Sequence, residues 1–384
     1  MTATATNKPP YIVPSMEEIR SMPWNGFNAI STFSGCGGSS TGYRMAGFKV
    51  LWASEFIDAA RDSYAANKAP YTILDGRDIC QVQSEDILKA INMKPGELDL
   101  FDGSPPCASF STAGKREAGW GKVKKYSDKS QRTDDLFFEF SRLVRGVQPK
   151  VFVAENVSGL VKGTTKGYFL DILADLKAAG YQVKCKVLDA QWLGVPQQRQ
   201  RTIFVGVRED LGIEPVHPKP LAYRYSLRDA LPWIIKSTMD SKGQFPVVQF
   251  KDGPHGTITC TNRSHITIEA ETDISRYAIG PEYDKLKEGD QSERYFSLVR
   301  CDREKPSPCV QASHGNTSTA GITHPTEKRK FTIAELKRIC AFPDDFILKG
   351  TYAQQWERLG RAVPPVMMKA VAEVIRDQIL ARIK

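Results

Sequence analysis

The sequence has no run of the roughly 18 consecutive apolar residues that a membrane-spanning helix needs. Its first residues, MTATATNKPPYIVPSMEEIR, also lack the basic region and the apolar region of a secretory signal peptide. We therefore expect a cytoplasmic protein that has no membrane partner.

No two of the eight cysteines form a CxxC pair. Such pairs are typical of zinc ribbons and thioredoxin-like redox sites, so the sequence favours neither kind of site. Without an export signal the thiols are expected to stay reduced. We predict no bound metal, and we expect most of the cysteines to be buried.

The chain of 384 residues is long enough for one large domain or two unequal ones, and its 41% hydrophobic and 25% charged residues are typical of a globular protein. Its formal net charge of +9 favours a polyanionic partner. More than half of this surplus lies between Lys115 and Arg132, where seven basic residues stand against two acidic ones. The alternative for such a run is a solvated surface loop.

The first half of the chain alternates short apolar runs with amphipathic stretches. Strands are predicted over 28–33, 49–53, 98–102, 150–154, 181–188 and 201–207, and helices over 59–67, 136–147 and 169–179, with another helix beginning at 42–46. Strands that alternate with helices of this length imply crossover connections. We therefore predict an α/β domain with a doubly wound, mostly parallel sheet that is covered on both faces.

The pattern changes after about residue 211, where proline, glycine, threonine and short alternating segments become common. This composition predicts a smaller, irregular domain that contains β-structure. We predict an N-terminal extension at 1–26, a main domain formed by 27–209 together with 345–384, and the smaller domain at 210–344.

A glycine-rich turn, FSGCGGSSTGY at 33–43, follows the first predicted strand and leads into a helix. Glycines in such a turn let the backbone approach a nucleotide-like ligand closely. Glu55 follows the second strand and Asp78 follows a third, where carboxylates can bind a ribose and an adenine amino group. Each acid alone is also explained as a solvated side chain, but in this order they favour an adenosine-containing cofactor.

Cys107 stands after two prolines at the end of another strand, in DGSPPCASFSTAG. The stiff turn would hold the thiol in a set direction, which suits a nucleophile; the alternative is a buried structural cysteine. Glu155 follows the next strand, and Gln197, Arg199 and Arg201 lie at a further strand tip. Because ligands bind outside the carboxyl ends of parallel strands, we expect these side chains to face one crevice.

In this order the motifs resemble those of the DNA cytosine-5 methyltransferases. The matches are FxGxGG at 33–38, the acids Glu55 and Asp78, PPC at 105–107, ENV at 155–157, QxRxR at 197–201, FTIAELKRICAFPDDF at 331–346 and GRAVPP at 360–365. They run from about residue 27 to the C-terminus in the family's order. The resemblance implies the fold of S-adenosylmethionine-dependent methyltransferases, with a catalytic main domain and a target-recognition domain within the smaller one.

The resemblance also implies a reaction on a cytosine that is flipped out of double-stranded DNA. Cys107 would add to C6 as a thiolate, while protonated Glu155 would hydrogen-bond N3. Arg201 would donate to the cytosine O2, and Arg199 would orient its neighbours. C5, made nucleophilic in this way, would take a one-carbon group from S-adenosylmethionine.

Binding residues follow from the same resemblance. Cofactor contacts are expected at Phe33, Gly35, Cys36, Gly37, Glu55, Phe56, Asp78, Ile79, Ser104, Pro106, Leu136, Arg361 and Val363. DNA contacts are expected at Lys115, Arg116, Lys122, Lys124, Lys125, Arg132, Gln197 and Arg263. We expect the protein to act on duplex DNA as a monomer, and to associate with the nucleoid in a bacterial or phage setting.

Two positions depart from the family's pattern. Ala108 follows the nucleophile where the family usually has glutamine, and Arg361 replaces the asparagine of GNxVPP beside the methionine end of the cofactor. Three interpretations of Arg361 stay open: an outward contact to DNA phosphate or solvent, a bond to the carboxylate of S-adenosylmethionine, or a pair with a second carboxylate in carboxy-S-adenosylmethionine. The last would make the product 5-carboxymethylcytosine. An RNA cytosine-5 methyltransferase and an inactive DNA-binding relative also stay open as alternatives.

Overall fold

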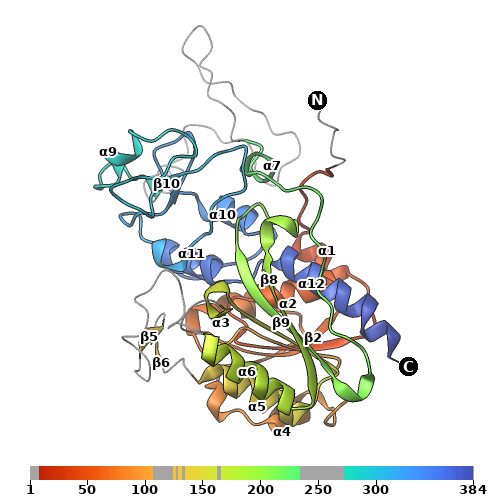
Figure 1. The fold of residues 1–384 in the computed structure, drawn as a ribbon. Coiled ribbons are helices and arrows are strands. Elements are labelled where there is room, and N and C mark those ends of the chain that lie inside the picture. Colours follow the sequence, from red (N-terminus) through yellow and green to blue (C-terminus); the bar gives the residue numbers. More distant parts are fainter. Residues whose placement is uncertain are drawn as a thin grey trace.

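A seven-stranded sheet forms the centre of the larger lobe (Figure 1). The computed structural model describes residues 8–106, 124–126, 129–131, 135–161, 166–233 and 272–383. The strands of the sheet are β1 (Asn28–Thr32), β2 (Lys49–Ser54), β3 (Ile73–Asp75), β4 (Leu100–Gly103), β7 (Val151–Val157), β8 (Tyr181–Asp189) and β9 (Gln200–Arg208). They lie in the order β3-β2-β1-β4-β7-β9-β8, so the predicted α/β architecture is confirmed.

The last strand departs from the crossover pattern. β3, β2, β1, β4 and β7 are parallel, but β9 runs antiparallel to both β7 and β8. The segment between Asp189 and Gln200 is too short for a crossover, which takes roughly a dozen residues or more, so β8 and β9 form a hairpin. Because β9 inserts between β7 and β8, its first residues lie beside the end of β7.

Side chains on the strands alternate between two cores, one on each face of the sheet. The surrounding helices are α2 (Gly38–Met45), α3 (Asp58–Asn67), α4 (Ser84–Ile91), α5 (Leu136–Val147), α6 (Lys166–Ala178) and α12 (Pro365–Gln378). Ala29 and Val153 pack into a core with α2 and α12, whereas Ile30 and Phe152 pack into a core with α4, α5 and α6. Figure 1 shows α4, α5 and α6 together on one face of the sheet.

The C-terminal helix α12 packs closely on α2. A Cβ at Gly38 would lie 2.2 Å from the Val363 carbonyl oxygen, and one at Gly42 would lie 2.5 Å from the Pro365 carbonyl oxygen. A side chain at either glycine would therefore clash with the backbone of the 363–365 segment, so both positions serve the packing of this segment on α2. The packing also brings the 360–365 segment beside the turn.

A smaller lobe lies beyond the strand ends (Figure 1). Its elements include α7 (Leu227–Ala230), α9 (Gly280–Tyr283), β10 (Val299–Arg300), η7 (Ala312–His314), β11 (Ile322–Thr323), α10 (Ile333–Ile339) and α11 (Tyr352–Arg361). One buried cluster joins this lobe to the larger one, since Cys36 and Met45 pack with Phe331 and Trp356. Helix α1 (Met16–Ser21) packs there too, so the described part of the predicted extension is folded onto the protein. No helix among the described residues is long and apolar enough to cross a membrane.

Candidate active site

A pocket of about 860 Å³ opens at the carboxyl ends of β1, β2, β4 and β7. In the sheet, β1 lies between β2 and β4, so the strand order changes direction at β1. Sheets of α/β proteins bind ligands at such a switch point. The predicted residues that line the pocket are Phe33, Gly35, Cys36, Glu55, Phe56, Ile79, Ser104, Pro106, Glu155, Arg199, Arg201, Arg361 and Val363.

The turn after β1 forms one wall of the pocket. Phe33 and Gly35 adopt positive φ angles of 51° and 56°. A side chain at Gly35 would meet no atom within 4 Å, so the backbone leaves open space here. This is the room that a closely bound ligand needs.

Glu55 is buried and held by the backbone at both oxygens. Its Oε2 accepts a 2.7 Å hydrogen bond from the Gly35 N–H, and its Oε1 accepts a 2.7 Å hydrogen bond from the Ile57 N–H. Burial raises the pKa of this carboxyl, and the two backbone donors oppose the rise. Each oxygen keeps a second lone pair, so Glu55 can also accept hydrogen bonds from the hydroxyls of a ligand.

Three predicted cofactor residues do not line this pocket. A Cβ at Gly37 would lie 3.0 Å from the Tyr64 ring. Asp78 caps the short helix η1 (Ile79–Gln81) by accepting a 3.0 Å hydrogen bond from the Cys80 N–H. Leu136 is buried in the core at the start of α5. Their predicted cofactor contacts therefore stay predictions.

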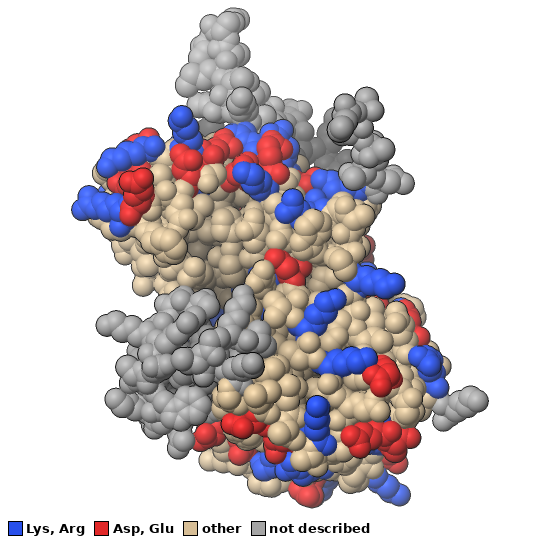
Figure 2. Space-filling model, viewed as in Figure 1, with Lys and Arg blue, Asp and Glu red and all other residues tan. Residues whose placement is uncertain are grey.

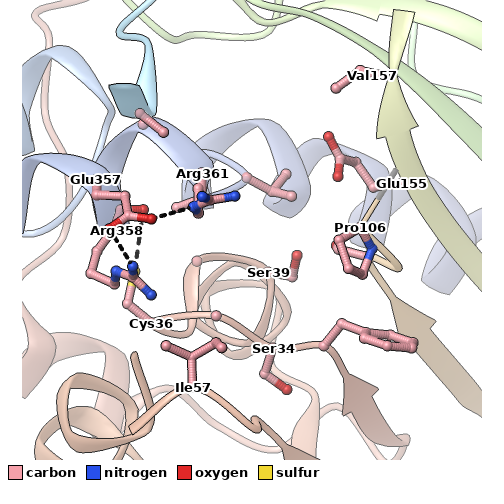
Figure 3. A pocket seen from close by; sticks show the side chains of 18 of the residues that line it. Ser34, Cys36, Ser39, Ile57, Pro106, Glu155, Val157, Glu357, Arg358 and Arg361 are labelled. Carbon is pink, nitrogen blue, oxygen red and sulfur yellow. Dashed lines mark hydrogen bonds and ion pairs between the residues drawn. The ribbon is translucent and has the colours of Figure 1, made fainter. Parts of the chain in front are cut away.

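Glu155 and Arg201 form an ion pair in another wall of the pocket, where Figure 3 shows Glu155 beside Pro106. Glu155 Oε1 lies 2.7 Å from Arg201 Nε, and the two side chains are 10% and 14% exposed. They meet because β7 and β9 are antiparallel, with Val157 opposite Arg201. Burial raises the pKa of Glu155, while Arg201 and Arg199 oppose the rise. A carboxyl with a raised pKa is suited to donate a proton to a ligand atom.

Arg199 is buried and ties β9 to the C-terminal segment. Its guanidinium donates to the carbonyl oxygens of Gly360 at 2.9 Å and Ala362 at 2.8 Å, on either side of Arg361. Its Nε has no hydrogen-bond partner among the described residues. Arg199 therefore positions the segment that carries Arg361, in addition to its electrostatic effect on Glu155.

Gln197 does not reach the surface of the structure, so its predicted DNA contact stays a prediction. Its side chain is 0% exposed. The amide donates to Cys340 Sγ at 3.2 Å, and its oxygen accepts from the Val310 N–H at 3.4 Å. Gln197 therefore anchors the chain near Val310 to the end of α10.

Part of the pocket wall was not predicted from the sequence. It includes Arg77, the α11 residues Glu357 and Arg358, and much of the 309–316 segment. Within that segment, Cys309 Sγ lies 3.6 Å from an Arg199 nitrogen. No pattern marks a contact between segments so far apart in the sequence. For Glu357, the sequence offered one indication. This residue precedes Arg361 by four residues, a spacing at which side chains contact each other on a helix.

Several predicted residues lie outside the described residues. These are Cys107, Lys115, Arg116, Lys122, Arg132 and Arg263. Lys124 and Lys125 belong to β5 (Lys124–Tyr126), which pairs with β6 (Lys129–Gln131). Figure 2 shows that, on the described part of the visible face, basic and acidic side chains are interspersed near the outer ends of the two lobes. The basic DNA contacts therefore stay predictions.

The sequence profile of the family described as C-5 cytosine-specific DNA methylase matches residues 27–377. The chain is 31% identical over 348 residues to the Type II methyltransferase M1.HphI of Haemophilus parahaemolyticus, across 90% of this chain and 86% of that protein. It is 30% identical over 385 residues to the Type II methyltransferase M.DdeI of Desulfomicrobium norvegicum, across 91% of this chain and 88% of that protein.

Solved structures resemble the whole fold. An E. coli protein encoded within a prophage and assigned as a DNA modification methyltransferase matches with a TM-score of 0.69 at 24% identity, over 92% of this chain and 100% of that chain. A mutant of Spodoptera frugiperda DNMT2 matches with a TM-score of 0.57 at 18% identity, over 91% of this chain and 98% of that chain. These likenesses confirm the predicted methyltransferase fold.

Proposed function

The chain belongs to the C-5 cytosine-specific DNA methylase family, and we propose that it is a DNA cytosine-5 methyltransferase that works through a covalent adduct on a flipped cytosine. The observation that carries this proposal is one pocket with two kinds of wall. Open space at Gly35 and the backbone-held carboxylate of Glu55 suit an adenosine-containing donor. The Glu155–Arg201 pair suits a nucleobase, so donor and acceptor would share the pocket.

The protein must first make the cytosine nucleophilic, because C5 is too electron-poor to take up a methyl group unaided. Addition of the Cys107 thiolate to C6 would place electron density on C5, and a proton from Glu155 to N3 would stabilise the adduct. The raised pKa of Glu155 supports this role, since the carboxyl keeps its proton to a higher pH than an ordinary one. Arg201 would donate to O2 of the base.

S-adenosylmethionine, when bound, supplies an electrophilic methyl carbon. C5 would bond to this carbon with the electron pair of the C4–C5 double bond of the adduct, while the bond between the methyl carbon and the donor sulfur breaks and leaves its electron pair on that sulfur. Loss of the C5 proton would then return an electron pair, which expels the Cys107 sulfur from C6, and return of the N3 proton to Glu155 would restore the neutral aromatic base. Apart from binding the donor, the protein would supply the Cys107 thiolate that adds to C6 and leaves again, and Glu155 would hold a proton at N3.

A cytosine within a stacked duplex cannot reach such a pocket, so the base must be flipped out. We propose that the basic segment 115–132 neutralises DNA phosphates and that the 210–344 region recognises the target, with one copy of the chain acting alone. Binding of this kind weakens as salt concentration rises, because each phosphate contact releases counterions.

Substrate class is tested by incubating the protein with tritium-labelled S-adenosylmethionine and either duplex DNA or tRNA. We expect label in duplex DNA, and we expect unlabelled duplex DNA, but not tRNA, to compete for it. Label in tRNA alone would replace this proposal with an RNA cytosine-5 methyltransferase. DNA binding without transfer would favour an inactive DNA-binding relative.

A second candidate function rests on Arg361, which lines the pocket with a side chain that is 33% exposed. A guanidinium in this wall can bind a carboxylate, and carboxy-S-adenosylmethionine carries an additional one on the transferred group. We propose DNA carboxymethyl transfer, with 5-carboxymethylcytosine as product, as this candidate. A contact from Arg361 to DNA phosphate or to the carboxylate of the ordinary donor competes with it.

A further inference from the structure

Three charged side chains of α11 meet in the wall of the pocket (Figure 3). Glu357 Oε1 lies 2.8 Å from Arg361 Nε, and Glu357 Oε2 lies 2.8 Å from a terminal nitrogen of Arg358. The i, i+4 spacing puts residues 357 and 361 on the same side of the helix. The Glu357 carboxylate therefore pairs with both guanidiniums, one at each of its oxygens.

The two arginines keep Glu357 ionised. Burial raises the pKa of this carboxyl, but Arg358 and Arg361 outweigh burial and the net shift is downward. The side chains of Glu357 and Arg358 are only 19% and 4% exposed, so water screens their interaction weakly. Arg361 thus faces the pocket with a charge that a neighbouring carboxylate already offsets.

Glu55 is a second carboxylate that lines this pocket, and Arg358 acts on it electrostatically. When both are ionised, Glu55 and Glu357 balance the two guanidiniums of Arg358 and Arg361. Among these four residues, a ligand with one more carboxylate would therefore find no uncompensated cation.

We propose that Glu357 is a specificity-determining residue: its ion pair with Arg361 disfavours a donor with a second carboxylate and so selects ordinary S-adenosylmethionine. The inference rests on the proposed function, in which S-adenosylmethionine is the donor. The proposed ion pair also favours methyl transfer over carboxymethyl transfer, because Arg361 can bind the additional carboxylate of the donor only when its ion pair with Glu357 is broken.

Replacing Glu357 with glutamine removes the offsetting charge and keeps the shape of the side chain. We expect Glu357→Gln to lower the ratio of the Kd for carboxy-S-adenosylmethionine to the Kd for S-adenosylmethionine by at least about tenfold, the effect of one uncompensated charge at a partly exposed site. Isothermal titration calorimetry of the full chain without DNA measures both constants, so the result does not depend on turnover.

Three further variants control this experiment. In an Arg361→Asn background, Glu357→Gln should change the ratio by less than about twofold, because the coupled partner is absent. Glu373→Gln breaks a comparable i, i+4 contact with Lys369 on α12, where the two charged atoms are 3.7 Å apart, and should keep the wild-type ratio. Glu357→Asp keeps the charge and should also keep a ratio close to wild type.

Two outcomes would overturn the inference while leaving the proposed function intact. One is an unchanged ratio in Glu357→Gln, and the other is a shift that persists without Arg361, in each case with a wild-type protein that binds S-adenosylmethionine. A wild-type protein that binds this donor but transfers nothing to DNA would contradict only the proposed function. A wild-type protein that binds neither donor would overturn both.

Discussion

Replacing Cys107 with serine is expected to lower the rate of methyl transfer to duplex DNA by at least about 10⁴-fold, because a hydroxyl is not ionised near neutral pH and does not add to C6. Duplex DNA that contains 5-fluorocytosine tests the same step directly. Fluorine cannot leave C5 as a proton does, so the wild-type protein should be trapped as a complex that survives denaturing electrophoresis. Cys107→Ser should give no such complex.

Cys185→Ser is the matched control for this experiment. Cys185 lies on β8, it is half-buried, and it does not line the pocket. We expect this variant to keep both turnover and trapping. Trapping or turnover that survives in Cys107→Ser would show that another group is the nucleophile and would contradict the proposed adduct.

Replacing Glu155 with glutamine is expected to lower kcat/KM by about 10²- to 10⁴-fold, the usual contribution of a positioned general acid. The wild-type pH profile should carry the same information. Because burial raises the pKa of Glu155, the protonated form persists above the range of an ordinary carboxyl. Thus kcat/KM should fall as the pH rises through this pKa. Glutamine has no proton to release in that range, so the variant should lack this limb of the profile.

Glu139→Gln provides the comparison, because Glu139 on α5 pairs with Arg142 at 2.8 Å and does not line the pocket. It should keep the wild-type rate and pH profile. If Glu155→Gln retained both, the buried carboxyl would have only a structural part in the Glu155–Arg201 pair. The proton donation to N3 would then have to come from another group.

The secondary structure of the larger lobe was largely predictable from the sequence. The predicted helix over 136–147 coincides with α5, because its apolar spacing is regular and a strand follows closely. The strands β1, β2 and β8 end within about a residue of their predicted limits. The direction of β9 was not predictable from periodicity, because an alternating pattern is the same for parallel and antiparallel strands.

The site residues at the ends of strands were predictable from the sequence, whereas those positioned by contacts between distant segments were not. Glu55 follows β2, and Glu155 lies on β7 one residue beyond the last pair of β7 with β4, so the sheet itself places both at one edge; the sequence had predicted that the strand ends before Glu155. Gln197 looked free for DNA, but it contacts Cys340, which lies 143 residues away. The role of Arg199 also depends on distant carbonyls, those of Gly360 and Ala362. Such contacts depend on the packing of the two lobes, which no local pattern encodes.

Mass spectrometry of nucleosides would show which one-carbon group the protein transfers to cytosine in DNA. The purified protein is incubated with duplex DNA and S-adenosylmethionine in one tube, and with carboxy-S-adenosylmethionine in another. We expect 5-methyl-2′-deoxycytidine in the first tube and little modified deoxycytidine in the second. A carboxymethyl product as abundant as the methyl product would contradict the selection by Glu357, and unmodified deoxycytidine in both tubes would contradict DNA cytosine-5 methyl transfer itself.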